Sequence, residues 1–275
     1  MFITLKVKSN PGKNNISGNN YILAYHHVER RILPTIARVL PDTFYWQLQY
    51  LETQGLYPCT LSNLVENIFP CRNSSQQTVA LTFDDGFQCF YDYVYPYLEE
   101  KNFSATIFVI TEYVGKRNSW DVNFGFKNIK HLDWQQIKEL AARGYEIGSH
   151  THRHYNLTQL DEKVLKFELD YSRKLIEDKI GKRVDFISYP FGRFNSKVLR
   201  SAKECGYQGG VTLNPFGVIS KEDLFQLPRL GVYLWDTKLN FKSKFNKNLG
   251  GRIEKAKLQA INFFAMGTII VNNFR

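Results

Sequence analysis

The stretch Thr78–Gly86, TVALTFDDG, joins a short apolar run to two adjacent carboxylates and a glycine. The run TVALTF is apolar and β-branched, which predicts a buried strand that ends where the polar residues begin. Asp84 and Asp85 repel each other, so their arrangement needs a stabilising partner. A divalent cation held by one carboxylate lowers the cost of keeping its neighbour ionised. Gly86 allows the backbone to turn sharply beside such a site.

Strand-like and helix-like segments alternate on both sides of this stretch. We expect further strands at 21–28, 104–110, 145–150, 183–192 and 207–213, and helices at 43–55, 91–102, 132–144, 160–181 and 196–206. Asp133 and Gln136 predict a capping box, and Gly144 and Gly181 predict helix ends. This alternation predicts a parallel α/β sheet or barrel.

Length, charge and cysteine content limit the class of protein. The 275 residues suit one α/β domain, and we expect a single domain over 21–275 after a flexible arm at 1–20. The net charge of +10 suggests anionic partners, but the lysines are scattered and no nucleic-acid motif accompanies them. Four cysteines without a CxxC pair predict free thiols, with a Cys59–Cys71 bridge as the alternative.

The N-terminal residues contain no apolar core of a signal peptide. From this we expect a cytoplasmic or membrane-associated protein rather than an extracellular one.

Three of the six histidines lie within SHTHRH, Ser149–His154, directly after a predicted strand. His150 and His154 share one face of a helical turn, whereas His150 and His152 share one face of a strand. Neutral imidazoles are good ligands for zinc and similar ions. A solvated surface run is the alternative, but a carboxylate from the aspartate pair would complete a metal site.

Strands of a parallel α/β fold place their carboxyl ends at one edge, and three unusual segments fall at such ends: TFDDG, GSHTHRH and SYPFG. A metal with two histidines and one aspartate keeps coordination positions open for hydrolysis. The remaining carboxylate can act as general base. The turn Tyr189–Gly192 offers backbone N–H groups for an oxyanion, although a plain β-turn explains it equally.

These motifs resemble those of the NodB-type polysaccharide deacetylases, carbohydrate esterase family 4. TFDDG matches the first family motif in full, HTHRH matches the second, and SYPFG matches the third in part. The three occur in family order, within a similar region at about 21–232. The resemblance implies a distorted (β/α) barrel, a divalent metal, often zinc, and removal of an N-acetyl group from an amino sugar.

The resemblance also implies residue roles. Asp84 corresponds to the general base, and the metal ligands would be Asp85, His150 and His154. Phe191 would give a backbone N–H to the oxyanion hole. His152 falls at a variable position and is not expected to be a ligand.

The chain departs from the family pattern at several points. Ser188 stands where the third motif has an arginine that orients the base, and the usual late Asp-x-x-Asp-Trp motif has no clear counterpart. LPRLGV at 227–232 resembles a subgroup with a later arginine, so Arg229 is expected to substitute.

The histidine that serves the family as general acid is also missing, because no histidine follows His154. LAYHHV at 23–28 resembles a segment of poly-N-acetylglucosamine deacetylases in which the first histidine lies near the metal. We therefore expect His26 to act as the acid or to partner the carboxylates. A buried, hydrogen-bonded strand histidine is the alternative, and His27, on the other strand face, is the weaker candidate.

The predicted function is a metal-dependent hydrolase that removes N-acetyl groups from amino sugars. Its expected substrate is an N-acetylated polymer or a lipid- or nucleotide-linked sugar, with contact to an anionic membrane suggested by the basic charge. A glycan-binding homologue with impaired catalysis is one alternative, motivated by the missing arginine and histidine. A hydrolase of non-sugar amides is another.

Overall fold

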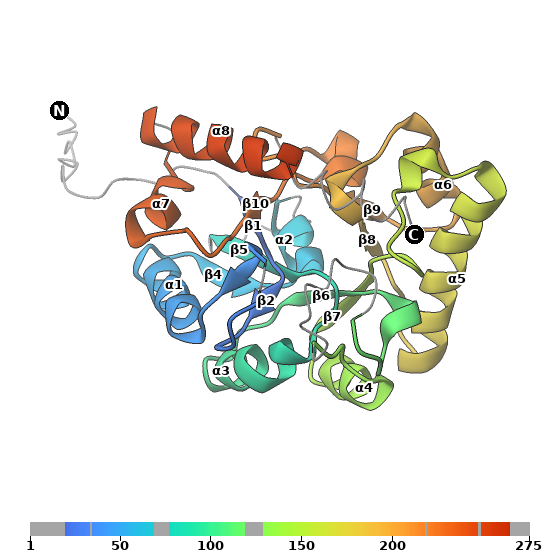
Figure 1. Cartoon of the computed structure of the whole chain (residues 1–275), viewed down its shortest axis with the longest axis horizontal. Helices are drawn as coiled ribbons and strands as arrows, with labels where there is room; N and C mark the ends of the chain where they lie inside the picture. Colours follow the sequence, from blue (N-terminus) through green and yellow to red (C-terminus); the bar gives the residue numbers. More distant parts are fainter. Residues whose placement is uncertain are drawn as a thin grey trace, which may run out of the picture.

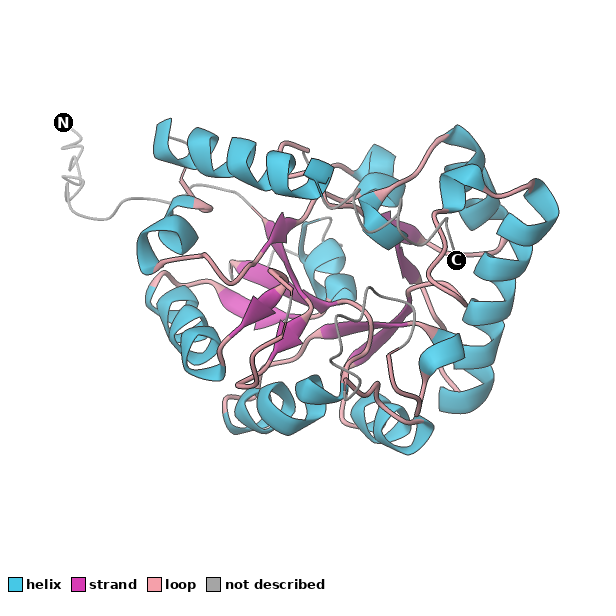
Figure 2. Cartoon of the chain, in the orientation of Figure 1, coloured by secondary structure: helices cyan, strands magenta, loops and turns pink. Residues whose placement is uncertain are grey.

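A parallel β-sheet forms the centre of the molecule, and helices lie around it (Figures 1 and 2). The computed structural model describes residues 20–33, 35–68, 77–118, 129–217, 219–246 and 249–264. The sheet has the strand order β10-β1-β5-β6-β7-β8-β9, and β4 also pairs with β5. Its strands are β1 (Tyr21–Tyr25), β4 (Tyr57–Cys59), β5 (Thr78–Phe83), β6 (Thr106–Val109), β7 (Glu146–Ser149), β8 (Phe186–Ser188), β9 (Gly209–Val211) and β10 (Leu230–Gly231). A small parallel pair, β2 (His27–Val28) and β3 (Arg38–Val39), lies beyond the end of β1.

The connections between strands are mostly helical. The α-helices are α1 (Pro41–Thr53), α2 (Leu61–Ile68), α3 (Tyr95–Glu100), α4 (Trp134–Ala142), α5 (Glu162–Ile180), α6 (Ser196–Glu204), α7 (Lys238–Ser243) and α8 (Leu249–Phe264). The π-helix is η1 (Phe90–Val94), and the 3₁₀ turns are η2 (Thr111–Tyr113), η3 (Leu157–Gln159), η4 (Pro190–Gly192) and η5 (Lys221–Gln226). The predicted α/β class with a distorted (β/α) barrel is confirmed.

One short segment joins the two edges of the sheet. Leu227 pairs with Val211 at the end of β9, and β10 pairs in parallel with β1 three residues later. The chain therefore crosses from the β9 edge to the β1 edge within a few residues, which closes the curled sheet. Arg229 lies inside this crossing segment, and its side chain is buried.

Local sequence signals explain several helix boundaries. Asp133 and Gln136 form the predicted reciprocal capping box at the start of α4. Asp161 caps α5, which ends at Gly181 in the left-handed conformation with a φ of 66°. The apolar faces of these helices pack on the strands, and Ile137 and Leu169 belong to the main core cluster.

The predicted helix at 91–102 differs from the observed structure. It begins as the π-helix η1, in which the N–H of Tyr95 bonds to the carbonyl of Phe90, five residues back. Pro96 then lies in the first turn of α3, directly after η1, where it has no N–H to donate to the preceding helical turn. The proline therefore separates two helical segments of different pitch.

Some predictions fall on residues outside the described ranges. Residues 1–19 of the predicted arm lie outside these ranges. Cys71 and the tail at 265–275 lie outside them too. Cys59, Cys89 and Cys205 are buried free thiols. Within the described part of the chain, no helix is long and apolar enough to span a bilayer.

Candidate active site

The carboxyl ends of neighbouring strands bring the predicted site residues to one edge of the sheet. Tyr25 at the end of β1 pairs with Phe83 at the end of β5, so His26 and the aspartate pair emerge side by side. The end of β7 pairs with both β6 and β8. His150 therefore follows a strand whose neighbours also end at this edge.

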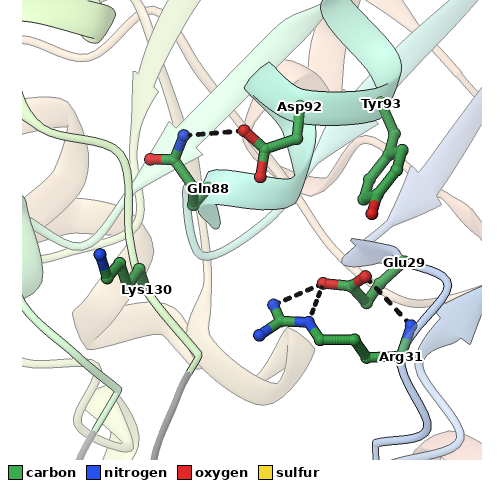
Figure 3. Close-up of a pocket in the computed structure, with 6 residues that line it drawn as sticks. All are labelled: Glu29, Arg31, Gln88, Asp92, Tyr93 and Lys130. Carbon is green, nitrogen blue, oxygen red and sulfur yellow. Dashed lines mark hydrogen bonds and ion pairs between the residues drawn. The ribbon is translucent and has the colours of Figure 1, made fainter.

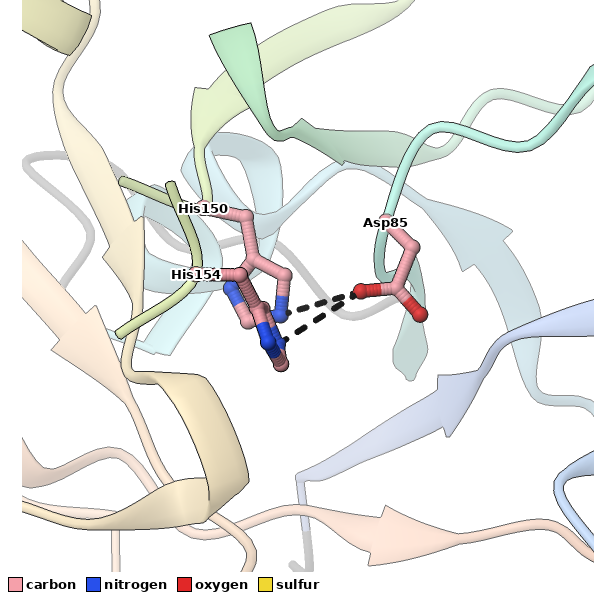
Figure 4. A group of neighbouring side chains, drawn as sticks. All are labelled: Asp85, His150 and His154. Atoms are coloured by element: carbon pink, nitrogen blue, oxygen red, sulfur yellow. Dashed lines mark ion pairs between the residues drawn. The ribbon is translucent and has the colours of Figure 1, made fainter. Parts of the chain in front are cut away.

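Asp85, His150 and His154 form one buried cluster (Figure 4). The Oδ1 atom of Asp85 lies 3.4 Å from Nε2 of His150 and 3.7 Å from Nε2 of His154. The three ligand atoms lie within 4.8 Å of one another. A cation about 2.1 Å from each ligand needs separations of roughly 3–4 Å. The cluster can therefore hold a metal ion.

Hydrogen bonds within the cluster also suit a cation. Nδ1 of His150 lies 2.8 Å from the carbonyl oxygen of Ser188, so Nδ1 carries the proton and Nε2 presents its lone pair. The buried Oδ1 of Asp85 accepts no hydrogen bond from any described residue. A buried carboxylate oxygen needs a partner, and a bound cation supplies one.

Electrostatics favour the ionised aspartate and a neutral His154. Burial raises the pKa of Asp85, but His150 and His154 outweigh burial and hold that pKa below its usual range. Burial and the neighbouring His150 lower the pKa of His154 to about 3. Burial lowers the pKa of His150, but Asp84 and Asp85 together raise it above its ordinary value.

Asp84 lies beside this cluster and binds Arg229. The guanidinium donates two parallel hydrogen bonds to the carboxylate, from Nη1 to Oδ1 at 2.8 Å and from Nη2 to Oδ2 at 2.7 Å. Arg229 is itself fixed by the carbonyl of Thr212 at 3.1 Å and the hydroxyl of Ser188 at 2.9 Å. Burial raises the pKa of Asp84, but Arg229 and His150 overcome it, and the pKa falls to about 2.

His26 lies next to Asp84 and is partly exposed to solvent. Its Nε2 lies 3.9 Å from Oδ2 of Asp84, and its side chain is 19 % exposed. His27 instead stacks on Phe87 with a 3.8 Å centroid separation, and burial lowers its pKa to about 3. Of the two histidines, only His26 therefore has both the access and the proximity that a proton donor needs.

Phe191 and His152 occupy different places relative to the cluster. Phe191 lies in η4 with a φ of 59°, and its ring contacts that of His154 at a 4.7 Å centroid separation. Nδ1 of His152 instead lies 2.9 Å from the Thr111 hydroxyl, and its Nε2 lies 3.3 Å from Glu112. Phe191 thus borders the cluster, whereas His152 turns away from it.

Strained backbone is concentrated at the site. Asp85, His154 and Phe191 have φ values of 70°, 61° and 59°, in the left-handed region. Such conformations cost about 1–3 kcal/mol each and persist where the surroundings enforce them. Gly86 also has positive φ, and a Cβ there would lie 2.9 Å from Cγ1 of Val109. The turn is therefore built to aim the Asp85 carboxylate at the histidines.

Three further residues support the site, and the sequence analysis gave none of them a role there. Ser188 donates to Oδ2 of Asp84 at 3.2 Å, and Thr82 accepts from Nη1 of Arg229 at 3.1 Å. Nδ1 of the buried His131 lies 2.8 Å from the backbone oxygen of Asp85. Thr82 and Ser188 lie within the motif segments, which was the only available signal for them.

The fold and the site together define a class, a closed parallel α/β barrel with an Asp–His–His cluster and a second aspartate at the carboxyl edge. The family model for polysaccharide deacetylases matches residues 72–210. The Bacillus subtilis (strain 168) protein YxkH, which carries the name of a polysaccharide deacetylase, is 30 % identical over 211 residues, or 77 % of this chain and 70 % of that protein. This chain therefore belongs to the polysaccharide deacetylase family.

Other relatives agree with this assignment. The poly-β-1,6-N-acetyl-D-glucosamine N-deacetylase of Staphylococcus epidermidis is 28 % identical over 207 residues, covering 70 % of this chain and 68 % of that protein. The structure of the Streptococcus pyogenes deacetylase PplD in complex with acetate is similar, with a TM-score of 0.67, 28 % identity and coverage of 78 % and 92 %. IcaB from Ammonifex degensii shares the fold, with a TM-score of 0.68, 22 % identity and coverage of 81 % and 94 %.

Proposed function

We propose that this chain is a metal-dependent hydrolase that removes N-acetyl groups from the amino sugars of a glycan. The observation that carries the proposal is the convergence of Asp84 with the Asp85, His150 and His154 cluster at one buried edge. A binding protein needs no second buried carboxylate beside a metal site. The name of the Staphylococcus epidermidis relative supports an N-acetylated glucosamine polymer as the substrate.

The three clustered side chains would hold the cation, and zinc is the ion we expect. Such a cation would polarise the acetamido carbonyl and lower the pKa of a nearby water. The carbonyl of Ser188 keeps His150 in the tautomer that leaves Nε2 available. The backbone turn at Asp85 holds the carboxylate against both imidazoles.

Asp84 would act as the general base and take the proton of the attacking water. Arg229 keeps that carboxylate ionised and fixes its direction through two hydrogen bonds. In this role Arg229 takes the place of the arginine missing from the SYPFG segment. The Ser188 hydroxyl, at the corresponding position, contacts both partners.

Two further groups would act on the carbonyl and on the leaving amine. The backbone N–H of Phe191 would donate to the oxyanion of the tetrahedral intermediate. His26, partly exposed and 3.9 Å from Asp84, would protonate the amine as acetate leaves. A lipid- or nucleotide-linked sugar as substrate, contact with an anionic membrane, and a cytoplasmic location stay predictions.

Two substitutions test the division of roles. We expect Asp85→Ala to lose bound zinc, and Asp84→Asn to keep zinc while turnover falls by about 10²–10⁴-fold. Acetate release from a β-1,6-linked N-acetylglucosamine pentamer measures turnover, and elemental analysis of the dialysed protein measures zinc. Thermal unfolding of each variant separates lost function from lost folding, since Asn at 84 leaves Arg229 without its anion.

The outcomes also decide between the proposal and its alternatives. Equal acetate release by wild type and a folded Asp84→Asn would remove the base role and favour a glycan-binding homologue. Release from a lipid-phosphate-linked N-acetylglucosamine but not from the pentamer would move the substrate to a linked sugar. Release from simple non-sugar acetamides alone would assign the chain to another class of amidohydrolase.

A further inference from the structure

A short segment that contains His131 lies against the turn that carries Asp85. The N–H of Leu132 donates to the carbonyl of Gly86 at 2.8 Å. An antiparallel bridge joins His131 to Phe87. The segment therefore pairs with the aspartate turn as a neighbouring strand would.

The same segment is held on its other side by the residues that follow η2. The N–H of His131 donates to the carbonyl of Lys116 at 3.0 Å, and the N–H of Gly115 donates to the carbonyl of Leu132 at 2.8 Å. The segment is thus the middle one of three short paired chains. Its backbone is fixed by hydrogen bonds that involve no metal ligand.

The side chain of His131 reaches the backbone of Asp85. Its Nδ1 lies 2.8 Å from the carbonyl oxygen of Asp85, and since a carbonyl can only accept, Nδ1 carries the proton and donates. The ring is buried, and its centroid lies 4.8 Å from that of Phe87 and 5.6 Å from that of Tyr113. These contacts hold the ring in the orientation from which it donates.

The carbonyl that accepts this bond belongs to a residue in a strained conformation. Asp85 has a φ of 70°, which costs a residue other than glycine about 1–3 kcal/mol. Because β5 ends at Phe83, the Asp85 carbonyl lies beyond the hydrogen-bond ladder of that strand. A buried acceptor that loses its donor costs about 1–3 kcal/mol, which is comparable with the strain. The bond from His131 therefore helps to keep the Asp85 carboxylate directed at His150 and His154.

We propose that His131 is a positioning residue that sets the zinc affinity of the cluster by holding the backbone of Asp85. The inference rests on the proposed function and adds to it a residue from outside the three motif segments. Residues that orient a metal ligand typically change metal affinity by about 10- to 100-fold when they are replaced. Loss of the His131 donor should therefore weaken zinc binding in a protein that still folds.

Two substitutions separate the hydrogen bond from the packing of the ring. His131→Phe keeps an aromatic ring beside Phe87 and Tyr113 but has no donor. His131→Asn loses the ring but places an amide nitrogen as many bonds from the backbone as Nδ1. We expect the dissociation constant for zinc to rise about 10- to 100-fold in His131→Phe and to stay within about threefold of wild type in His131→Asn.

Competition between the metal-free protein and a chromophoric zinc chelator measures this constant. The measurement is made at a temperature where thermal unfolding shows that each metal-free variant is folded. A merely structural role would lower the unfolding temperature and leave the zinc affinity of the folded protein unchanged. If His131→Phe does not fold, His131→Leu takes its place, because leucine has nearly the shape of asparagine and no donor.

Lys130 provides the control because it directly precedes His131 in the same segment. Its side chain is exposed and, with Gln88, lines a polar cavity of about 590 Å³ (Figure 3). Its backbone carbonyl accepts from the N–H of Gln88 at 2.8 Å, and Lys130→Ala retains that carbonyl. Lys130→Ala should therefore leave the zinc affinity unchanged. An equal loss of affinity in Lys130→Ala and His131→Phe would overturn the specific role of the His131 ring.

The outcomes separate this inference from the proposed function. Wild-type zinc affinity in a folded His131→Phe, or weaker binding by His131→Asn than by His131→Phe, would overturn the positioning role alone. Acetate release from the pentamer by the wild-type protein tests the hydrolase independently. Weaker zinc binding by His131→Phe without any release by the wild type would support the positioning role and overturn the hydrolase. A wild-type protein that binds no zinc would overturn both.

Discussion

Arg229 fixes the position of the Asp84 carboxylate. The geometry of this contact leads to a specific prediction. A lysine at this position has no planar fork and cannot reproduce the two parallel hydrogen bonds at 2.8 and 2.7 Å. We expect Arg229→Lys to lower kcat by about 10- to 100-fold while zinc content stays unchanged. Steady-state acetate release and metal analysis measure the two quantities.

A surface arginine provides the control for this change. Arg143 pairs with Glu99 at 3.5 Å on an exposed face, so Arg143→Lys should leave kcat unaltered. An Arg229→Lys protein that folds and turns over at the wild-type rate would show that Asp84 needs no guanidinium. A loss of zinc in that variant would instead mean that Arg229 supports the metal cluster.

At the residue scale, the sequence was informative where chemistry is concentrated in short motifs. Asp84, Asp85, His150 and His154 lie in two such motifs, and the structure brings them together. Ser188 contacts Asp84 across 104 positions, a contact that exists only because the barrel closes. No local pattern contains that information, so the supporting hydrogen bonds could not be predicted.

Glu146, at the start of β7, caps a helix far away in the sequence. Its carboxylate accepts from the backbone N–H groups of Leu61 at 3.0 Å and Ser62 at 3.2 Å, and from the hydroxyls of Ser62 and Thr106. Glutamine offers a single acceptor oxygen and turns an NH₂ towards these donors. We expect Glu146→Gln to reduce the free energy of unfolding by about 1–3 kcal/mol in urea denaturation.

An exposed glutamate serves as the comparison. Glu162 begins α5 on the surface, and Glu162→Gln should change the free energy of unfolding by less than about 0.5 kcal/mol. If Glu146→Gln and Glu162→Gln lower the free energy of unfolding by equally small amounts, water replaces the Glu146 carboxylate at the start of α2.

At the element scale, local caps made several helix starts predictable, although α7, which Thr237 caps, was missed and α1, which has no side-chain cap, was predicted. The starts of α4 and α5 follow from Asp133 and Asp161, which lie beside the residues that they cap. At α2 the local cap of Thr60 on the N–H of Asn63 is joined by Glu146, 85 positions from Leu61, and we predicted no helix there. The π-turn of η1 was missed because its sequence is compatible with an ordinary α-helix.

At the scale of the whole molecule, a buried ionic network ties the C-terminal helices to the barrel. Nζ of Lys244, at the end of α7, donates to the carbonyl of Gly231 in β10 at 3.0 Å and to Glu254 of α8 at 3.0 Å. It also lies 3.1 Å from Asp236, and Lys257 contacts both carboxylates. Since β10 follows the segment that carries Arg229, this network also supports the candidate site.

Replacing Lys244 with methionine tests that coupling. Among the described residues, the change leaves Lys257 as the one cation that contacts Asp236 and Glu254, so we expect the free energy of unfolding to fall by about 3–5 kcal/mol in urea denaturation. Because β10 loses a donor to Gly231, kcat should also fall under conditions where the variant is folded. Lys242→Met, on the exposed face of α7, should cost less than about 1 kcal/mol. If Lys244→Met is destabilised but keeps full kcat, the helices stabilise the barrel without positioning Arg229.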